Sequence, residues 1–166
     1  MLELDRIDIQ LLAALQHDGR ATNPALGERV HLSASQVSRR IQRLEDAGLI
    51  DRCVTLLRAA KVGLTVTAFT RVSLERHGEA HNEAFDRAVT LMPEVLECYS
   101  VTGPYDYQLR IVVADLEAFA QFMMHRLMRL PGVRGVESSV VLQEIKRTTE
   151  LPLEQAAQVR AAPGRT

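Results

Sequence analysis

The sequence has little that could bind a metal ion. Its two cysteines, Cys53 and Cys98, form no C-x-x-C pair, and its five histidines are scattered along 166 residues. Structural zinc sites need closely spaced ligand pairs, so we expect no metal and no cofactor. Free cysteines are among the most buried residue types, and we expect both to be small hydrophobic residues in the core.

Long apolar runs are also missing. No segment approaches the roughly 18 apolar residues of a membrane helix, and residues 1–5 lack the basic-then-apolar order of a signal peptide. We therefore expect a cytoplasmic protein without membrane contact. A hydrophobic fraction of 46% and a mean hydropathy of −0.05 exclude a disordered or low-complexity chain, and the length fits one ordinary domain or two small ones.

Net charge gives no argument for nucleic-acid binding. The 20 basic and 21 acidic residues give a formal net charge of −1, so any such argument must rest on where the charges lie. They are unevenly placed, since residues 33–44 contain three arginines and no acidic residue.

The first fifty residues have apolar side chains at helical spacing. They form three groups and predict three short helices: Ile7, Leu11, Leu12 and Leu15; Leu26 and Val30; Val37, Ile41 and Leu44. Gly19 is expected to end the first helix, and Gly48 the third. Asn23 is expected to cap the second helix ahead of Pro24.

A short turn joins the second and third predicted helices. Only His31 and Leu32 precede Ser33, which together with Gln36 predicts a capping box at the start of the third helix. So short a connection favours a sharp crossing of the two helices, as in a helix-turn-helix. A plain three-helix bundle fits the same pattern and stays an alternative.

The third helix favours DNA binding because its expected outer face carries hydrogen-bonding and cationic groups, with no carboxylate before Glu45. Arginine can bridge the guanine O6 and N7 atoms or hold a phosphate, and serine and glutamine can reach base edges or the backbone. A solvated helix face is the alternative, although such faces usually mix charges of both signs. The candidate DNA-binding residues are Ser33, Ser35, Gln36, Ser38, Arg39, Arg40, Gln42 and Arg43.

After Gly48 the pattern changes to alternating strands and helices. We predict strands at 66–74, 95–101, 105–113 and 136–145, helices at 81–92 and 116–130, and a further short strand within 50–57. The order β-α-β-β-α-β from residue 66 predicts a ferredoxin-like domain, in which both helices cover one face of a four-stranded antiparallel sheet. A second subunit can cover the other face, so we expect a homodimer.

Several motifs occur in a fixed order along residues 4–150. The first half contains LDRID at 4–8, LQHDGR at 15–20, VSRRIQRLE at 37–45 and GLI at 48–50, and the second contains TGPYDY at 102–107, LPGV at 130–133, Ser138 with VVL at 140–142, and Lys146. In this order the motifs resemble those of the Lrp/AsnC, or feast/famine, family of bacterial and archaeal transcription regulators. Three departures from the family pattern occur: His31 stands where a glycine is common, Arg52-Cys53 where Gly-Tyr is common, and Gly27 where an alanine is usual.

The resemblance implies a fold, partners and a division into domains. Such proteins bind promoter or operator DNA through an N-terminal helix-turn-helix, dimerise through a ferredoxin-like domain, assemble into octamers or similar rings, and usually respond to an amino acid. The implied class is α+β, with a three-helix, winged-helix-like domain at 1–50, a linker strand and hinge at 51–65, a ligand-binding and oligomerisation domain at 66–150, and a tail at 151–166. Residues 33–44 would be the recognition helix and 23–30 the helix that braces it.

The resemblance also implies an effector site at a contact between dimers. Its candidate residues are Thr102, Gly103, Tyr105 and Asp106, with Ser138 and Ser139 as neighbours. A glycine turn can expose backbone N–H groups to a carboxylate, and Asp106 can accept a hydrogen bond from an ammonium group. Without the resemblance the same residues fit an ordinary hairpin turn, in which the aspartate bonds its own backbone. Apolar residues nearby favour an aliphatic or aromatic effector.

We therefore predict a sequence-specific DNA-binding transcriptional regulator whose DNA binding or assembly is modulated by an amino acid or a related small molecule, and not an enzyme. One alternative is an enzyme similar to siroheme decarboxylases, which resemble the family in both domains. The second half of this chain, however, has no cluster of histidines and arginines suited to a tetrapyrrole. Another alternative is an architectural protein that binds DNA without sequence preference.

Overall fold

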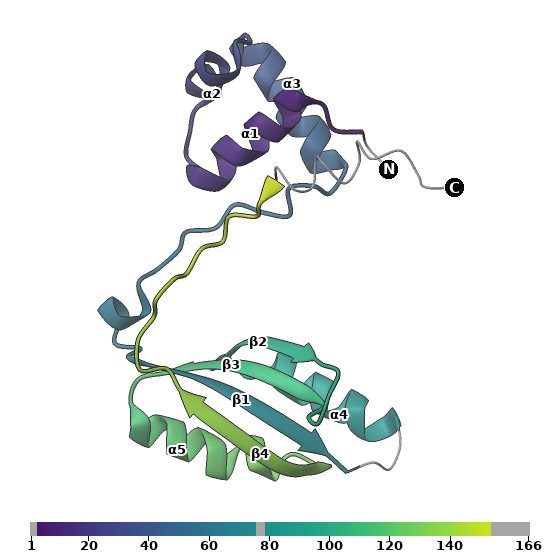
Figure 1. The fold of residues 1–166 in the computed structure, drawn as a ribbon, viewed down its shortest axis with the longest axis vertical. Coiled ribbons are helices and arrows are strands. Elements are labelled where there is room, and N and C mark those ends of the chain that lie inside the picture. The colour runs from purple at the N-terminus through teal and green to yellow at the C-terminus, as the bar shows by residue number, and fades with distance from the viewer. Residues whose placement is uncertain (1–2, 76–78, 154–166) are drawn as a thin grey trace. The chain divides into compact units, whose positions relative to one another are not determined.

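The computed structural model describes residues 3–75 and 79–153, with the side chains of residues 79–81 left out (Figure 1). The chain forms two compact units: a helical unit of Met1–Leu56 with Lys146–Thr166, and a sheet unit of Leu57–Ile145. This grouping differs from the predicted boundary at residue 150. The C-terminal segment joins the helical unit because the backbone of Leu151 is hydrogen-bonded to the side chain of Gln16.

The helical unit contains α1 (Arg6–His17), α2 (Asn23–Val30) and α3 (Ala34–Asp46), which confirms the three predicted helices. Their apolar stripes meet in a small core in which Leu11, Leu26 and Val37 are fully buried. The cap of α2 was predicted wrongly. Thr22, not Asn23, is the cap, because its side chain accepts a hydrogen bond from the backbone N–H of Ala25.

The turn between α2 and α3 is tight. His31 has left-handed backbone angles (φ 57°, ψ 43°), and the Leu32 N–H donates to the Gly27 carbonyl at 3.0 Å. A Cβ atom on Gly27 would lie 2.4 Å from the Leu32 carbonyl oxygen, so the absence of a side chain lets the turn pack against α2. Ser33 then starts α3 with the predicted capping box to Gln36.

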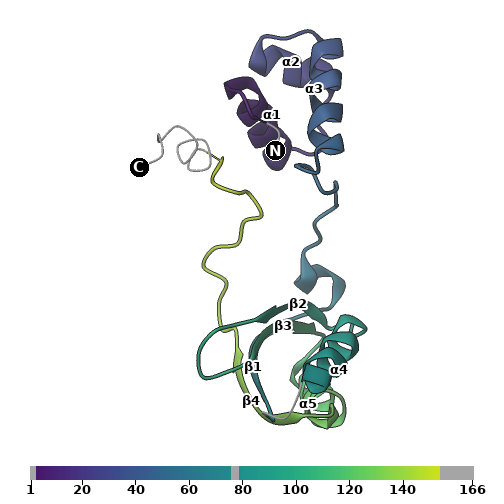
Figure 2. The same ribbon diagram turned by 90° about the vertical axis from the view of Figure 1, so that its right-hand side faces the viewer.

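The sheet unit follows the predicted β-α-β-β-α-β order. Its elements are β1 (Val66–Leu74), α4 (Glu79–Thr90), β2 (Val95–Ser100), β3 (Tyr107–Val113), α5 (Leu116–His125) and β4 (Val133–Val140), with short 3-10 helices at Ala59–Val62 and Leu127–Arg129. The strands lie in the order β2-β3-β1-β4 and all pairs are antiparallel. Both α-helices lie on one side of the sheet (Figure 2). The ferredoxin-like prediction is confirmed.

Besides shifts of one or two residues at other ends, two predicted elements have clearly different bounds in the structure and a third does not occur. The helix predicted to reach residue 130 ends at His125, because Arg126 leaves helical geometry (φ −124°, ψ −67°). Strand β4 covers 133–140 and not 136–145, because its partner β1 offers backbone groups only from Leu74 back to Thr67. No strand occurs within residues 50–58, all of which the structure describes. A strand needs a neighbour for its backbone groups, and this segment has none among the described residues.

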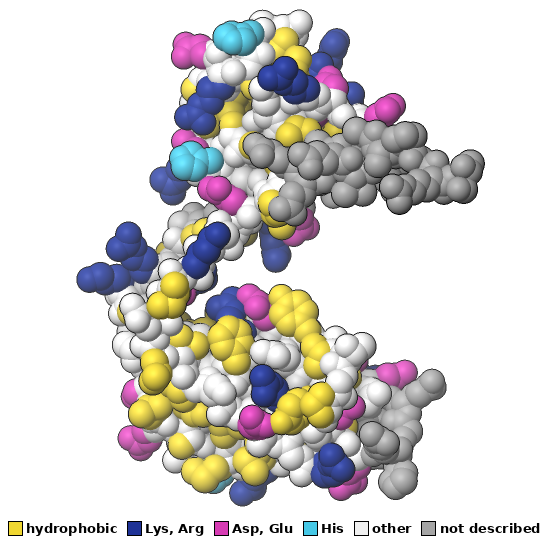
Figure 3. All heavy atoms as spheres, viewed as in Figure 1, with side chains coloured by type: hydrophobic (Ala, Val, Ile, Leu, Met, Phe, Trp, Pro, Cys, Tyr) yellow, Lys and Arg dark blue, Asp and Glu magenta, His cyan; other side chains and the backbone are white. Residues whose placement is uncertain are grey.

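One face of the sheet and the two helices enclose the main core. Leu109 and Ile111 from β3 are fully buried, as is Phe85 from α4, whose ring lies 4.6 Å from that of Tyr107. The opposite face has no covering element in the described chain, and hydrophobic side chains are exposed on it among charged ones (Figure 3). Both cysteines are exposed, so the prediction of buried cysteines was wrong. Cys53 lies in the irregular segment after α3, and Cys98 on the edge strand β2.

The left-handed turn residue provides a test of the helix-turn-helix geometry. Replacing His31 with valine should lower the free energy of unfolding by about 1–2 kcal/mol, because a β-branched residue fits positive φ poorly. Replacing it with glycine should be neutral or stabilising by up to about 1 kcal/mol. Urea denaturation followed by far-UV circular dichroism would measure both, and equal stability of the two variants would contradict this geometry.

Candidate functional site

The predicted DNA-binding residues are all on α3 or at its cap, but their side chains make different contacts. Ser33 and Gln36 are occupied by the capping box: the Ser33 N–H donates to Gln36 Oε1 at 3.0 Å, and the Gln36 N–H donates to Ser33 Oγ at 3.3 Å. Ser35 is exposed, and its hydroxyl lies 3.1 Å from that of Ser33. These contacts fix the first turn of the helix.

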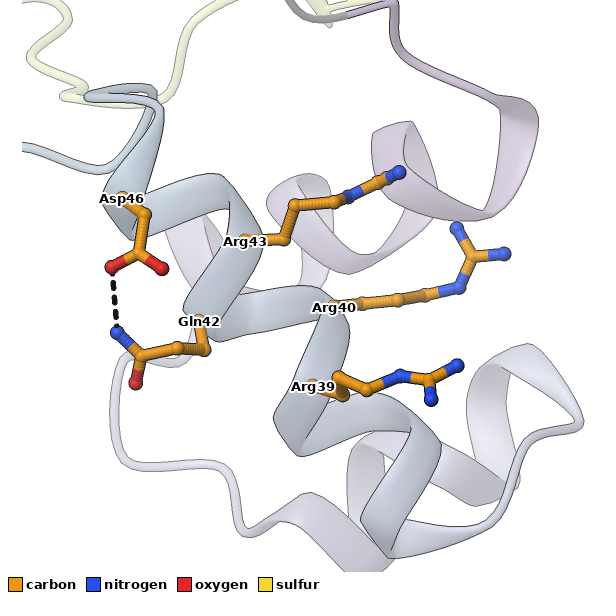
Figure 4. Close-up of a pocket in the computed structure, with 5 residues that line it drawn as sticks. All are labelled: Arg39, Arg40, Gln42, Arg43 and Asp46. Atoms are coloured by element: carbon orange, nitrogen blue, oxygen red, sulfur yellow. Dashed lines mark hydrogen bonds between the residues drawn. The ribbon is translucent and has the colours of Figure 1, made fainter.

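Arg40 and Arg43 bind a buried carboxylate of α1. Asp8 is fully buried, and its two oxygens accept hydrogen bonds from Arg40 Nη1 at 2.7 Å and Arg43 Nη2 at 2.5 Å. Arg40 Nη1 also donates to Asp5 Oδ2 at 2.7 Å. The face predicted to carry no carboxylate therefore has two beside it in space, because α1 packs next to α3. In Figure 4 the arginine side chains extend to one side of α3, away from Gln42 and Asp46.

The ion cluster favours the charged forms of Asp5 and Arg40. Partial burial opposes ionisation of Asp5, but hydrogen bonds from the Asp8 N–H and from Arg40 outweigh burial and lower the pKa of Asp5. Hydrogen bonds to Asp5 and Asp8 raise the pKa of Arg40. These contacts link the start of α1 to the middle of α3.

A second group of predicted residues forms an exposed row along α3, which we call the outer stripe: Ser35, Ser38, Arg39 and Gln42. Their spacing of three and four residues puts their backbone positions along one exposed part of the helix, although the Arg39 side chain extends to the side of Arg40 and Arg43 (Figure 4). At about 100° per residue this face lies roughly opposite the buried Val37 and Leu44 and the partly buried Ile41. Gln42 donates to Asp46 Oδ1 at 2.9 Å, whereas no ion pair of Arg39 is found within the described residues. Arg39 is therefore the arginine of α3 whose guanidinium is available for a phosphate or a base.

The predicted effector loop lies between β2 and β3. Gly103 has φ 122°, a conformation that favours glycine, and a Cβ there would meet nothing within 4 Å. The backbone carbonyl of Asp106 closes the turn by accepting from the Val101 N–H at 3.0 Å, but the Asp106 side chain does not bond its own turn as in an ordinary hairpin. Its Oδ2 accepts a hydrogen bond from the Leu74 N–H at 2.7 Å, and its own N–H donates to the Val72 carbonyl at 2.9 Å. Asp106 thus anchors the loop to the end of β1, with Oδ1 directed to no donor in the described chain.

The two serines predicted beside this loop point to opposite faces of the sheet. Ser138 Oγ lies 2.9 Å from Thr70 Oγ1, on the face that the helices cover, while Ser139 pairs with Phe69 on the open face. Adjacent strand residues alternate between faces. The structure therefore does not bring both serines to one site.

Two residues that sequence reasoning missed lie next to the loop on the open face. The Tyr105 hydroxyl donates to Glu137 of β4, and Arg71 of β1 lies over the Tyr105 ring, 5.4 Å from its centre. Arg71 also pairs with Glu137 at 3.5 Å. The hydrogen bond to Glu137 raises the pKa of Tyr105, and Arg71 opposes that shift. Only the strand register, which places Arg71 opposite Glu137, could have found this group.

Within residues 3–75 and 79–153, no group of three or more histidine, cysteine or acidic side chains is placed to hold a metal ion. None of the described helices is long and apolar enough to span a membrane.

A helix-turn-helix unit followed by a ferredoxin-like unit defines a two-domain transcriptional regulator. Comparison with known families makes the assignment specific. The chain belongs to the Lrp/AsnC family: residues 4–45 match the AsnC-type helix-turn-helix domain, and residues 67–151 match the Lrp/AsnC ligand binding domain. The predicted family, fold and class of function are confirmed.

Relatives match nearly the whole chain. The DNA-binding transcriptional activator DecR of Escherichia coli K12 is 40% identical over 151 residues, which cover 91% of this chain and 99% of DecR. The leucine-responsive regulatory protein of the same strain is 36% identical, covering 90% and 91%. The crystal structure of transcriptional regulator NMB0573 from Neisseria meningitidis, a complex with L-Met, superposes with a TM-score of 0.90 at 43% identity, covering 93% and 99%.

Removal of the buried carboxylate should destabilise the helical unit. Replacing Asp8 with alanine should lower the free energy of unfolding of the helical unit by about 2–3 kcal/mol, because two guanidinium groups lose their partner and the capping box of α1 is lost. Amide hydrogen exchange of α3 under urea would measure this locally. Replacing Asp46 with alanine is the control. Because Asp46 is exposed, this change should lower the free energy of unfolding by less than about 0.5 kcal/mol. Similar losses in both variants would contradict the proposed importance of Asp8.

Proposed function

We propose that the protein controls transcription by binding specific DNA sites through the outer stripe of α3, and that an amino acid bound to the sheet unit changes this binding. The observation that carries the proposal is the exposed row of Ser35, Ser38, Arg39 and Gln42 on a helix whose opposite face is buried. Relatives named as DNA-binding regulators support it. A homodimer would place two such helices about 34 Å apart, or a multiple of this, to meet successive major grooves.

The residues of α3 have different parts in this proposal. Arg39, Ser35, Ser38 and Gln42 contact DNA, since arginine, serine and glutamine can all reach base edges or phosphates. Arg40 and Arg43 bind Asp8 and set the orientation of α3. Their N–H groups that Asp8 does not use can still contact phosphates at the edge of the groove, because a guanidinium has five donors.

The effector is proposed to bind at the loop of residues 102–106. Asp106 Oδ1 accepts from the ammonium group of an amino acid, and backbone N–H groups around Gly103 bind its carboxylate. The neighbour NMB0573 was crystallised with L-Met, so an apolar amino acid is the first candidate. Tyr105, held by Glu137, would then lie beside the ligand side chain.

Arg39 is the residue to change first in a DNA-binding test. Fluorescence anisotropy with DNA flanking the protein's own gene should show Kd rising about tenfold or more in Arg39→Ala, as expected for loss of a base or phosphate contact. If the contact is to a phosphate, the slope of log Kd against log salt falls by about one. Arg87→Ala, an exposed arginine of α4, is the control. Unchanged affinity in Arg39→Ala would refute the outer stripe as the DNA-binding surface, and uniform footprints on any DNA would indicate an architectural protein.

The variant Asp106→Asn tests the ligand-binding role of this side chain separately from its structural role. An asparagine oxygen can still accept from the Leu74 N–H, but the charge that binds an ammonium group is lost. Calorimetry with L-methionine is expected to show about 10–100-fold weaker binding, with the thermal stability little changed. Asp18→Asn, at an exposed turn in the helical unit, is the control. Methionine binding that is equal in the two variants would exclude Asp106 from the site.

A further inference from the structure

The sheet unit has a cavity at the end of the sheet where the chain enters β1. Its volume is about 610 Å³, a size typical of small-molecule pockets in proteins. Leu64, just before β1, lines one side, and the end of β3 and α5 line the others. Ala114 also lines it, and the Ala114 carbonyl accepts from the Thr65 N–H at 3.2 Å. The loop of residues 102–106 contributes nothing to this cavity, so the effector proposed there does not use it.

Most of the cavity wall is apolar. Phe122 of α5 and Val112 and Val113 of β3 are buried and form its inner part. Leu64 at its edge is still 40% exposed. A ligand that covers this wall removes apolar surface from water, which favours binding of an apolar body.

Two charged side chains meet on this wall. Arg126, which follows α5, donates from Nη1 to Glu94 Oε1, and its Cζ atom lies 5.5 Å from the centre of the Phe122 ring. The backbone of Glu94 is fixed as well, because its carbonyl accepts from the Val112 N–H at 2.9 Å. A guanidinium has five N–H donors, and Glu94 is the acceptor found for Arg126 within the described chain. The other donors of a well-oriented guanidinium are therefore available to a ligand.

The Glu94 carboxylate has an acceptor without a donor. Its Oε2 atom is buried and has no hydrogen-bond partner among the described residues. Leaving a buried carboxylate oxygen unpaired is costly, and native structures rarely do so without a reason. The side chain as a whole is 27% exposed and lines the cavity. Because the last torsion of a glutamate turns easily, a donor in the cavity can pair with this oxygen.

We propose that this cavity binds a small neutral carboxamide with an apolar body. The ligand C=O accepts from Arg126, its N–H donates to the Glu94 carboxylate, and its body packs on Phe122 and Leu64. A neutral head group fits because Glu94 and Arg126 already balance each other. A ligand with only a carboxylate would meet the charge of Glu94, and one with only an ammonium group would meet that of Arg126. The site does not depend on the amino-acid site proposed above.

Benzamide is a suitable probe, because benzoate and benzylamine have the same ring with a head group that lacks the donor or the acceptor. Saturation-transfer difference NMR with the full chain would measure the three affinities. Benzamide should bind about tenfold or more tightly than either control, as expected for one hydrogen bond to a charged group. Equal affinities, or no binding of benzamide, would overturn the proposal.

Glu94→Gln tests whether the probe binds at this carboxylate. Glutamine can still accept from Arg126, but it has an NH₂ group in place of the unpaired oxygen. Benzamide affinity should fall about tenfold, while benzoate should bind at least as well as before, because a like charge has been removed. Glu117→Gln, at an exposed position in the first turn of α5, is the control and should change neither affinity. An equal loss for both ligands in Glu94→Gln would indicate a structural effect and overturn the assignment.

Competition separates this cavity from the proposed effector site. Excess L-methionine should leave benzamide binding unchanged, whether or not methionine binds at the loop of residues 102–106. Displacement of benzamide by methionine would mean that the two ligands share one site, which would overturn the proposal of a separate carboxamide site.

Discussion

The helical unit depends on the ion pairs and hydrogen bonds of the buried Asp8 carboxylate. This carboxylate accepts from the Asp5 N–H to cap α1, and it binds Arg40 and Arg43 of α3. Burying a carboxylate is costly unless charged donors surround it, and here two guanidinium groups do so. Because Arg40 and Arg43 are one helical turn apart, the pair fixes both the position of α3 and its rotation about its own axis. The rotation decides which side chains face outward.

The same kind of constraint recurs in the sheet unit. The carboxylate of Asp106 accepts from the Leu74 N–H, so the loop between β2 and β3 is attached to the end of β1 and is not a free hairpin tip. In both units one aspartate connects a functional segment to an element distant in sequence. The functional segments are thereby positioned by few, strong polar contacts.

How well the sequence predicts the structure depends on how local each feature is. The helices, the Ser33–Gln36 capping box and the β-α-β-β-α-β order follow from neighbouring residues, and they were predicted. The partner of Arg40 was not, because Asp8 lies on another helix and nothing in the α3 sequence indicates it. Strand register likewise decides that Ser138 and Ser139 face opposite ways and that Arg71 meets Glu137. Pairing across the fold, and not local pattern, sets the composition of both candidate sites.

The topology of the sheet limits how an effector can influence DNA binding. The loop of residues 102–106 is bonded to β1 at Val72 and Leu74, whereas the chain enters β1 at Val66 and leaves β4 after Val140, which pairs with Ala68. Both covalent connections to the helical unit thus leave from one end of the β1–β4 pair, and the loop lies at the other. Nine residues of strand span about 30 Å. Within one chain a signal from the loop must therefore pass along a hydrogen-bonded ladder that resists deformation.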